Sequence, residues 1–165
     1  MEEIKFSKRR IKMKLLLKRQ RIRNSWKSRN IAETDVHALA QLMLEAYQGT
    51  IDYEGETLED AISEVKGTIN GKYGTFLQKC SFIIENNGKA ISATIVTWMD
   101  AMNMPLLAFS MTLPLCKNRG MTTFLLKKTM NALVGEGYKE LYLVVTEANI
   151  PAKHLYEKLG FTAIQ

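Results

Sequence analysis

The segment Leu113–Thr123, LPLCKNRGMTT, carries the strongest chemical signal in the sequence. A strand is expected to end at Leu113 and a helix to begin near Gly120, with a basic loop between them. Free N–H groups at the start of a helix attract anions, and a glycine lets the backbone approach a ligand closely. Lys117 and Arg119 add positive charge. The pattern favours a phosphate site, in particular one for a pyrophosphate, but an ordinary strand–helix connection fits it equally well.

Other kinds of chemistry find less support. The loop lacks the GxxxxGK[ST] pattern of a P-loop, and its single glycine does not make a GxGxxG turn. Cys116 lies in the loop without a histidine near it in sequence, so we interpret it as a packing residue. The two histidines and two cysteines are far apart, so no metal-ligand spacing is present and no metal is expected.

A second informative segment is Val145–Phe161, VTEANIPAKHLYEKLGF. Asn149 follows an expected strand and can cap a helix that has Pro151 in its first turn and Gly160 just past its end. The positions that would share one face of this helix are Ala152, Leu155, Tyr156 and Leu159. Taken alone, this pattern indicates an amphipathic helix with a tyrosine in the core.

The remaining sequence predicts the elements that position these two segments. Strand periodicity appears over residues 11–17, 26–31, 81–85, 90–99, 106–113, 141–145 and 161–164. Helical spacing appears over residues 36–48, 58–69, 120–134 and 150–159. Asn87-Gly88 is a hairpin signal, so three of the strands should form an antiparallel meander. We therefore predict a mixed α/β domain with a central sheet.

Composition narrows the class of protein. The 165 residues are 46% hydrophobic and 24% charged, which suits one compact domain and excludes general disorder. Two cysteines are too few for a disulfide scaffold, which makes a reducing compartment the default. No apolar run is long enough for a signal peptide or a membrane span. We expect a soluble, cytoplasmic protein without a membrane partner.

The positive charge is concentrated near the N-terminus. Residues 1–30 hold 12 Lys and Arg against 2 Glu, a balance of +10, whereas residues 31–165 hold 11 against 15, a balance of −4. We divide the chain into a basic arm, residues 1–25, with an edge strand in it, and a domain over residues 26–165. Such an arm could contact nucleic acid. A solvated, solubilising segment is the more common meaning of a charge run, so no nucleic-acid partner is expected.

Taken together, the two segments resemble the GNAT superfamily of N-acetyltransferases. That family has a [QR]-x-x-G-x-[GA] loop, which here reads Lys117-Asn118-Arg119-Gly120-Met121-Thr122. Pro114 fits the V-x-P lead-in to the loop, with Thr112 in the first position. The family's later motif, an Asn followed by A-x-x-L-Y-x-x-L-G-F, is matched by Asn149, Ala152, Leu155, Tyr156, Leu159, Gly160 and Phe161. The departures are Lys117 for Arg or Gln, and Thr122 for Gly or Ala. The resemblance extends from about Trp26 to the C-terminus.

The resemblance implies a fold and a co-substrate. It implies a mixed, mostly antiparallel sheet flanked by about four helices, in which the strands at 106–113 and 141–145 splay apart. Acetyl-CoA would lie in that opening, with its pyrophosphate on the loop amides. The residues implied in binding it are Met111, Thr112, Leu113, Lys117, Asn118, Arg119, Gly120, Met121, Thr122, Thr123, Asn149 and Ala152.

The resemblance also implies direct transfer of the acetyl group to an amine. Tyr156 would be the general acid that protonates the departing thiolate, and a backbone N–H of the splayed strand would stabilise the oxyanion. No Asp or Glu lies within 106–113, so the general base stays open among Asp52, Glu54, Glu56, Asp100 and Glu147. The acidic cluster of Asp52, Glu54 and Glu56 falls where the family has its acceptor wall. It would suit a cationic amine, and an exposed polar loop explains it equally well.

Three hypotheses follow for the function. The first is an acetyl-CoA-dependent N-acetyltransferase that acts on a small-molecule or protein amine, with a homodimer left open. The second is a noncatalytic acyl-CoA-binding or sensing module, and the third is a nucleic-acid-associated protein that uses the basic arm.

Overall fold

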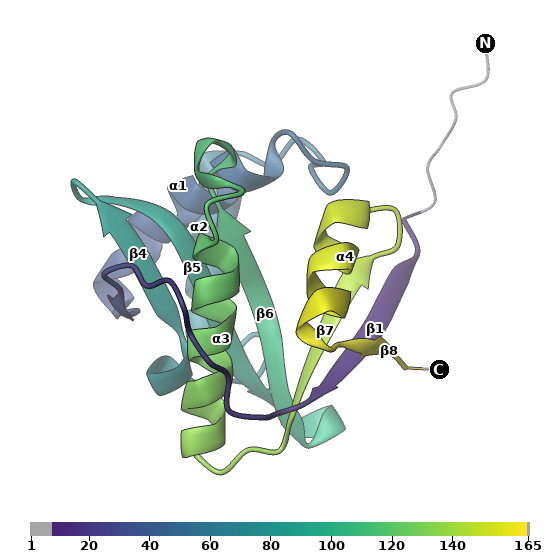
Figure 1. The fold of residues 1–165 in the computed structure, drawn as a ribbon. Coiled ribbons are helices and arrows are strands. Elements are labelled where there is room, and N and C mark those ends of the chain that lie inside the picture. Colours follow the sequence, from purple (N-terminus) through teal and green to yellow (C-terminus); the bar gives the residue numbers. More distant parts are fainter. Residues whose placement is uncertain (1–7, 165) are drawn as a thin grey trace.

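One twisted sheet with helices on both faces makes up the structure, a computed structural model that describes residues 8–164 (Figure 1). The strands are β1 (Arg10–Leu16), β2 (Arg29–Asn30), β3 (Thr75–Phe76), β4 (Phe82–Asn86), β5 (Lys89–Met99), β6 (Met104–Thr112), β7 (Glu140–Thr146) and β8 (Thr162–Ala163). The helices are α1 (Val36–Tyr47), α2 (Leu58–Ile69), α3 (Met121–Gly135) and α4 (Ile150–Leu159). The mixed α/β class predicted from the sequence is confirmed.

The strand order is β2-β4-β5-β6-β7-β1-β8, with β3 paired to part of β5. The meander β4-β5-β6 is antiparallel, and its first turn uses left-handed backbone at Asn87 and Gly88, with φ of 52° and 78°. The pair β6 and β7 is parallel. The crossover between these two strands is α3, and it covers the same face of the sheet as α4 (Figure 1).

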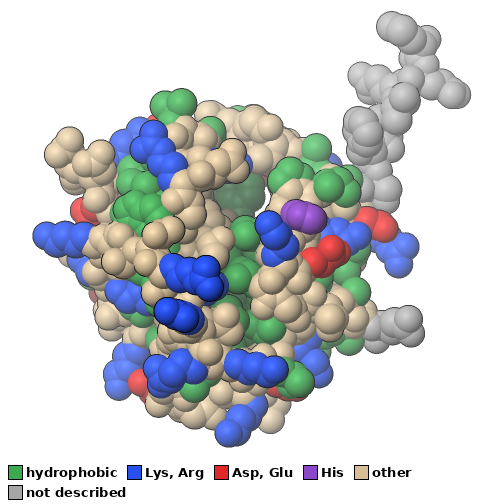
Figure 2. Space-filling model, in the orientation of Figure 1, with side chains coloured by type: hydrophobic (Ala, Val, Ile, Leu, Met, Phe, Trp, Pro, Cys, Tyr) green, Lys and Arg blue, Asp and Glu red, His purple; other side chains and the backbone are tan. Residues whose placement is uncertain are grey.

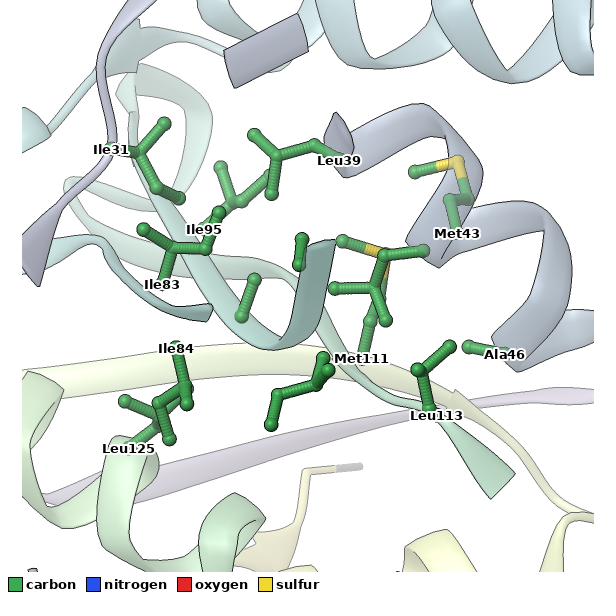
Figure 3. Packing of buried hydrophobic residues seen from close by; sticks show 14 of the residues in the cluster. Ile31, Leu39, Met43, Ala46, Ile83, Ile84, Ile95, Met111, Leu113 and Leu125 are labelled. Atoms are coloured by element: carbon green, nitrogen blue, oxygen red, sulfur yellow. The ribbon is translucent and has the colours of Figure 1, made fainter. Parts of the chain in front are cut away.

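The main core lies between the sheet and its helices. Leu39 and Met43 of α1 approach the sheet from one side, and Leu125 of α3 approaches from the other (Figure 3). The buried strand residues Ile83 and Ile95 lie between them. Helix α2 begins with a capping box, in which the Thr57 hydroxyl accepts from the Asp60 N–H at 3.2 Å. This packing fixes the helices on either side of the sheet.

The position predicted for the N-terminal strand is wrong. The alternation in residues 11–17 does form a strand, β1, but it lies between β7 and β8 instead of at an edge. Its register with β7 runs from Arg10 opposite Thr146 to Leu16 opposite Glu140. Period-two alternation identifies a strand but not its partner, and no turn joins β1 to either neighbour. A basic arm outside the domain is therefore too simple, because this strand completes the sheet.

Two shorter elements also differ from expectation. The strand predicted at residues 26–31 is reduced to the two residues of β2, and the connection at 72–79 contains β3 and a 3₁₀ turn at Gln78–Cys80. Among the described residues, no helix has both the length and the apolar character needed to cross a membrane.

The burial of β1 predicts a large effect of a small change. Met13 is 1% exposed and packs among side chains of α3, α4 and β7, whereas its neighbour Lys12 is exposed. Met13→Ala should lower the free energy of unfolding by about 2–5 kcal/mol, because it leaves a cavity. The control Lys12→Ala should stay within about 0.5 kcal/mol of the parent in the same urea titration. Equal effects of the two changes would contradict the placement of β1.

Candidate active site

The sheet opens between β6 and β7. The two strands pair only at Leu106 and Tyr142 and then separate toward their C-terminal ends. Val144 remains 37% exposed although β7 lies inside the sheet. A hollow with hydrophobic side chains at its base lies between the part of the surface over α3 and the part over α4 (Figure 2). The opening is therefore a place where a ligand can contact strand backbone directly.

The backbone of β6 offers hydrogen-bond donors to this opening. The N–H of Leu113 donates to the carbonyl of Ile91 on β5 at 2.9 Å. In an antiparallel ladder successive residues alternate direction, so Met111 also faces β5 and the N–H groups of Ser110 and Thr112 face β7. Of the three residues implied from the sequence, only Thr112 thus directs its N–H into the opening. Ser110 was missed, although the same alternation could have identified it.

The loop before α3 has the features of an anion site. Gly120 has φ of 82° and Asn118 has φ of 64°, so both adopt left-handed backbone. The first helical hydrogen bond runs from the Phe124 N–H to the Gly120 carbonyl, at 2.9 Å. The N–H groups of residues 121–123 therefore precede the hydrogen-bond ladder of the helix. Lys117 and Arg119 are exposed beside them, so the loop combines free donors with positive charge.

Thr122 binds the strand instead of standing free in the loop. Its hydroxyl lies 2.6 Å from that of Thr112, which in turn lies 2.8 Å from that of Ser92 on β5. This chain of hydroxyl groups ties the start of α3 to the end of β6. The threonine that replaces a small residue of the family pattern is accommodated in this way.

Tyr156 reaches the opening from α4. Its side chain is half-buried, and its hydroxyl lies near Ser110 of β6. Burial raises the pKa of Tyr156 to about 12, an effect that the neighbouring Ser110 hydroxyl partly offsets. Its ring packs edge-on against Phe161, with the centroids 5.7 Å apart. The phenol is thus a protonated donor held at the splayed strand.

Asp52 brings a carboxylate to the end of β7. One of its oxygens accepts from the Thr146 hydroxyl at 2.7 Å, and the other accepts from the Asn149 amide at 3.2 Å. The side-chain carbonyl of Asn149 also caps α4, because it accepts a hydrogen bond from the Ala152 N–H at 3.4 Å. Asn149 therefore fixes both the last helix and this half-buried carboxylate. Its contact with Asp52 could not be read from the sequence.

The other acidic candidates point elsewhere. Glu54 is exposed and pairs with Lys8, and Glu56 accepts from the Glu54 N–H of its own loop at 2.9 Å. Asp100 lies beyond the far end of β5, where it lines a separate open hollow of about 630 Å³. Glu147 lies 3.8 Å from Arg9. Of the five candidate bases, Asp52 alone is bonded to β7 and to the residue that caps α4.

Sequence reasoning also missed Tyr47, the last residue of α1. Burial raises its pKa well above the usual range, and the neighbouring Tyr156 and Asp52 raise it further, while Arg10 opposes them. The end of α1 therefore lies within electrostatic range of groups from α4, from the acidic loop and from β1. The helical spacing of Tyr47 with other apolar residues gave no hint of a polar environment.

The donor set of the site decides which co-substrate it suits. Within residues 8–164, no three His, Cys, Asp or Glu side chains lie close enough together to hold a metal ion. The donors of the loop and of β6 are instead N–H groups and hydroxyls, which suit a phosphate and an amide-bearing chain. The residues present therefore fit coenzyme A.

Solved structures with a similar fold include several N-acetyltransferases. A GCN5-related N-acetyltransferase from Sphaerobacter thermophilus matches with a TM-score of 0.70 and 16% identity, over 94% of this chain and 48% of its own. The Escherichia coli ribosomal-protein-S18-alanine N-acetyltransferase matches with a TM-score of 0.66 and 21% identity, over 84% of this chain and 79% of its own. The aminoglycoside N-acetyltransferase AAC(6')-Iy, in complex with CoA, matches with a TM-score of 0.63 and 16% identity, over 84% of this chain and 89% of its own. The chain thus spans about half the length of the Sphaerobacter protein.

The family is established by the sequence. The family model described as Acetyltransferase (GNAT) family matches residues 36–161. No curated protein matches the chain in sequence. The protein belongs to the GNAT acetyltransferase family, as its two motifs indicated.

The geometry of Gly120 predicts a specific loss of binding. Any other residue at this position would have to adopt the left-handed backbone of Gly120, and its Cβ would lie 3.3 Å from the Trp26 ring. Gly120→Val should weaken CoA binding at least tenfold in calorimetric titration, because it displaces the loop amides. The control is Gly137→Val, beyond the other end of α3, where φ is 89° and the space is open. The control should suffer similar backbone strain yet keep its affinity, and full CoA affinity in Gly120→Val would overturn the loop assignment.

Proposed function

We propose that this protein transfers an acetyl group from acetyl-CoA directly to the nitrogen of an amine. The observation that carries the proposal is the meeting of a phenol and a carboxylate at the opening between β6 and β7. Tyr156 lies near Ser110 of β6, and Asp52 accepts a hydrogen bond from the Thr146 hydroxyl at the end of β7. Both groups contribute to the raised pKa of Tyr47. Acetyl-CoA supplies the acyl group as a thioester.

The loop before α3 would hold the pyrophosphate. Its donors are the N–H groups of residues 118–123, and Lys117 and Arg119 supply the charge. Lys117 is a point charge that lacks the bidentate fork of an arginine, so the backbone carries more of the recognition here. The N–H groups of Ser110 and Thr112 would then bind the pantetheine arm and the thioester carbonyl along β6.

Transfer forms one C–N bond and breaks one C–S bond. The proposed base, Asp52, takes a proton from the incoming ammonium so that the nitrogen can attack. An N–H of β6 stabilises the negative charge that develops on the carbonyl oxygen. The Tyr156 hydroxyl donates to the sulfur as the thiolate leaves.

The high pKa of Tyr156 refines its proposed role. A thiol has a pKa of ~8.5, so complete transfer of a proton from a phenol with a pKa near 12 would run uphill. A hydrogen bond from the phenol still stabilises the charge on the sulfur, and solvent can then protonate the thiolate. We therefore propose that Tyr156 donates a hydrogen bond to the leaving sulfur and that the phenol keeps its proton throughout.

The acceptor is proposed only as a cationic amine. The carboxylate of Asp52 and the neighbouring acidic loop favour a positively charged group. The matched proteins include an enzyme named for an aminoglycoside and one named for a protein alanine, so the fold accommodates different amines.

Turnover separates this function from a noncatalytic acyl-CoA-binding module. The protein is incubated with acetyl-CoA and a panel of amines, namely aminoglycosides, polyamines and peptides with a free N-terminus, and free thiol is measured. Amine-dependent thiol release with a matching acetylated product supports the transferase. CoA binding without release on any amine supports the sensing module.

Tyr156→Phe is the sharpest test of the mechanism. The ring and its contact with Phe161 remain, and only the hydroxyl is lost. We expect kcat to fall by roughly 10²–10³-fold, the usual effect of losing one hydrogen-bond donor to developing charge, while CoA affinity stays nearly unchanged. A kcat within about threefold of the parent would remove Tyr156 from the mechanism.

The same pair of proteins gives a pH test. Donation requires the protonated phenol, and a pKa raised to about 12 keeps it protonated well above the usual ~10. The ratio of parent to variant kcat should therefore stay constant from about pH 7 to pH 10. A ratio that declines with an apparent pKa below 10 would show that Tyr156 ionises earlier than its surroundings imply.

Asp52→Asn tests the base. The amide keeps the size of the side chain but cannot take up the proton, so kcat/KM should fall by roughly 10²–10⁴-fold. The matched controls are Glu54→Gln and Glu56→Gln, which remove the same charge from the same loop without contacts to β7. We expect less than threefold loss in each control. Comparable losses in all three variants would show that Asp52 acts only through its negative charge, like its neighbours, and not as the base.

A further inference from the structure

The segment that joins β1 to β2, residues 17–28, crosses the outer face of α3 (Figure 1). Its sequence, LKRQRIRNSWKS, contains five Lys and Arg and no Asp or Glu. We call this segment the crossing. Helix α3 beneath it, MTTFLLKKTMNALVG, also contains no acidic residue. The two together form a surface of one sign of charge.

The crossing is held on α3 and on the loop that follows it. The Leu17 N–H donates to the carbonyl of Lys139, just before β7, at 2.9 Å. The Gln20 N–H and carbonyl bond to the Asn131 amide, at 2.6 Å and 3.0 Å. The Trp26 ring packs against that of Phe124, with the centroids 5.7 Å apart. Contacts from one end of the segment to the other fix its cations relative to the fold.

The polar, apolar and charged side chains of the crossing differ in their exposure to solvent. Gln20 and Ile22 are partly buried, whereas Arg19, Arg21 and Arg23 are exposed. The alternation of partly buried and exposed residues therefore places these three arginines on the solvent side of the crossing.

Further cations join these three arginines. The set consists of Lys18, Arg19, Arg21, Arg23 and Lys27 of the crossing, together with Lys127 of α3, and we call it the basic row. Lys127 donates to the Arg21 carbonyl at 3.3 Å, which joins the helix to the crossing. Within residues 8–164, none of the six has a carboxylate within ion-pair distance. Lys and Arg side chains are spread over this face of the molecule (Figure 2).

We propose that the basic row binds the phosphate backbone of a nucleic acid. A linear array of unpaired cations complements a linear polyanion, and the sequence pI of about 9.3 fits such a partner. A membrane surface fits less well, because the apolar residues of the crossing itself, Leu17, Ile22 and Trp26, pack toward the core. The sequence alone favoured a solubilising role; the fixed, one-sided arrangement is what the structure adds.

Salt dependence is the direct measurement. A fluorescent 20-nucleotide single-stranded RNA is titrated with the protein at several salt concentrations, with saturating CoA present to occupy the coenzyme site. Neutralising six phosphates predicts a slope of log K against log salt of about −4, from 0.7 per phosphate. Affinity should then fall roughly 300-fold between 50 and 200 mM salt. Matched single-stranded and duplex DNA distinguish the kinds of nucleic acid.

The variants localise the binding. Arg21→Gln with Arg23→Gln should reduce the slope to about −2.8, and Arg21→Lys with Arg23→Lys should restore it, because the charge returns. Lys12→Gln with Lys66→Gln removes the same charge outside the basic row and should leave the slope unchanged.

Several outcomes would overturn the proposal. They are a salt-independent affinity, an equal loss in the Lys12 and Lys66 control, and binding that disappears when CoA is present. Binding to phosphatidylserine vesicles with none to any nucleic acid would identify a membrane surface instead. The RNA assay does not use acetyl transfer, so its failure leaves the proposed function standing.

Discussion

The separation of β6 from β7 is the constraint on which the rest of the structure depends. After one pairing, at Leu106 and Tyr142, the strands diverge and leave the N–H groups of Ser110 and Thr112 facing an opening. Strand backbone that lacks a partner inside a sheet is costly unless water or a ligand satisfies it. The same opening admits Tyr156 from α4. The gap in strand pairing is therefore the place where we propose that the chemistry occurs.

The opening persists because each side is braced separately. On one side, β6 is held by the long β5 ladder and by the hydroxyl chain from Ser92 to Thr122. On the other side, β7 is paired along its whole length with β1. Without β1, β7 would keep only its single pairing to β6 within the sheet. The strand within the basic N-terminal region therefore supports one side of the opening.

Local signals in the sequence predicted most of the fold. Capping at Thr57, the hairpin at Asn87-Gly88 and the periodicity of α3 depend on neighbouring residues, and each formed as expected. The two motifs located the loop and Tyr156 for the same reason. The pairing of β1 with β7 and the contacts of Asp52 depend on residues 94 to 136 positions away, and local sequence patterns carry no information about such distant partners. The direction of each β6 N–H is intermediate in difficulty. Alternation along the strand can be read locally, but the strand that a given N–H faces is known only from the pairing register.

The pairing of β1 also determines when the sheet can close. Its partners on β7 lie between 124 residues away, from Leu16 to Glu140, and 136 residues away, from Arg10 to Thr146. Translation at roughly 5–20 residues per second separates the synthesis of the two strands by on the order of ten seconds. Throughout that interval, β1 has an unsatisfied edge and two apolar side chains, Met13 and Leu15, without their core. A second copy with a vacant place beside β7 offers the same partner, so strand exchange competes with correct closure at high chain concentration.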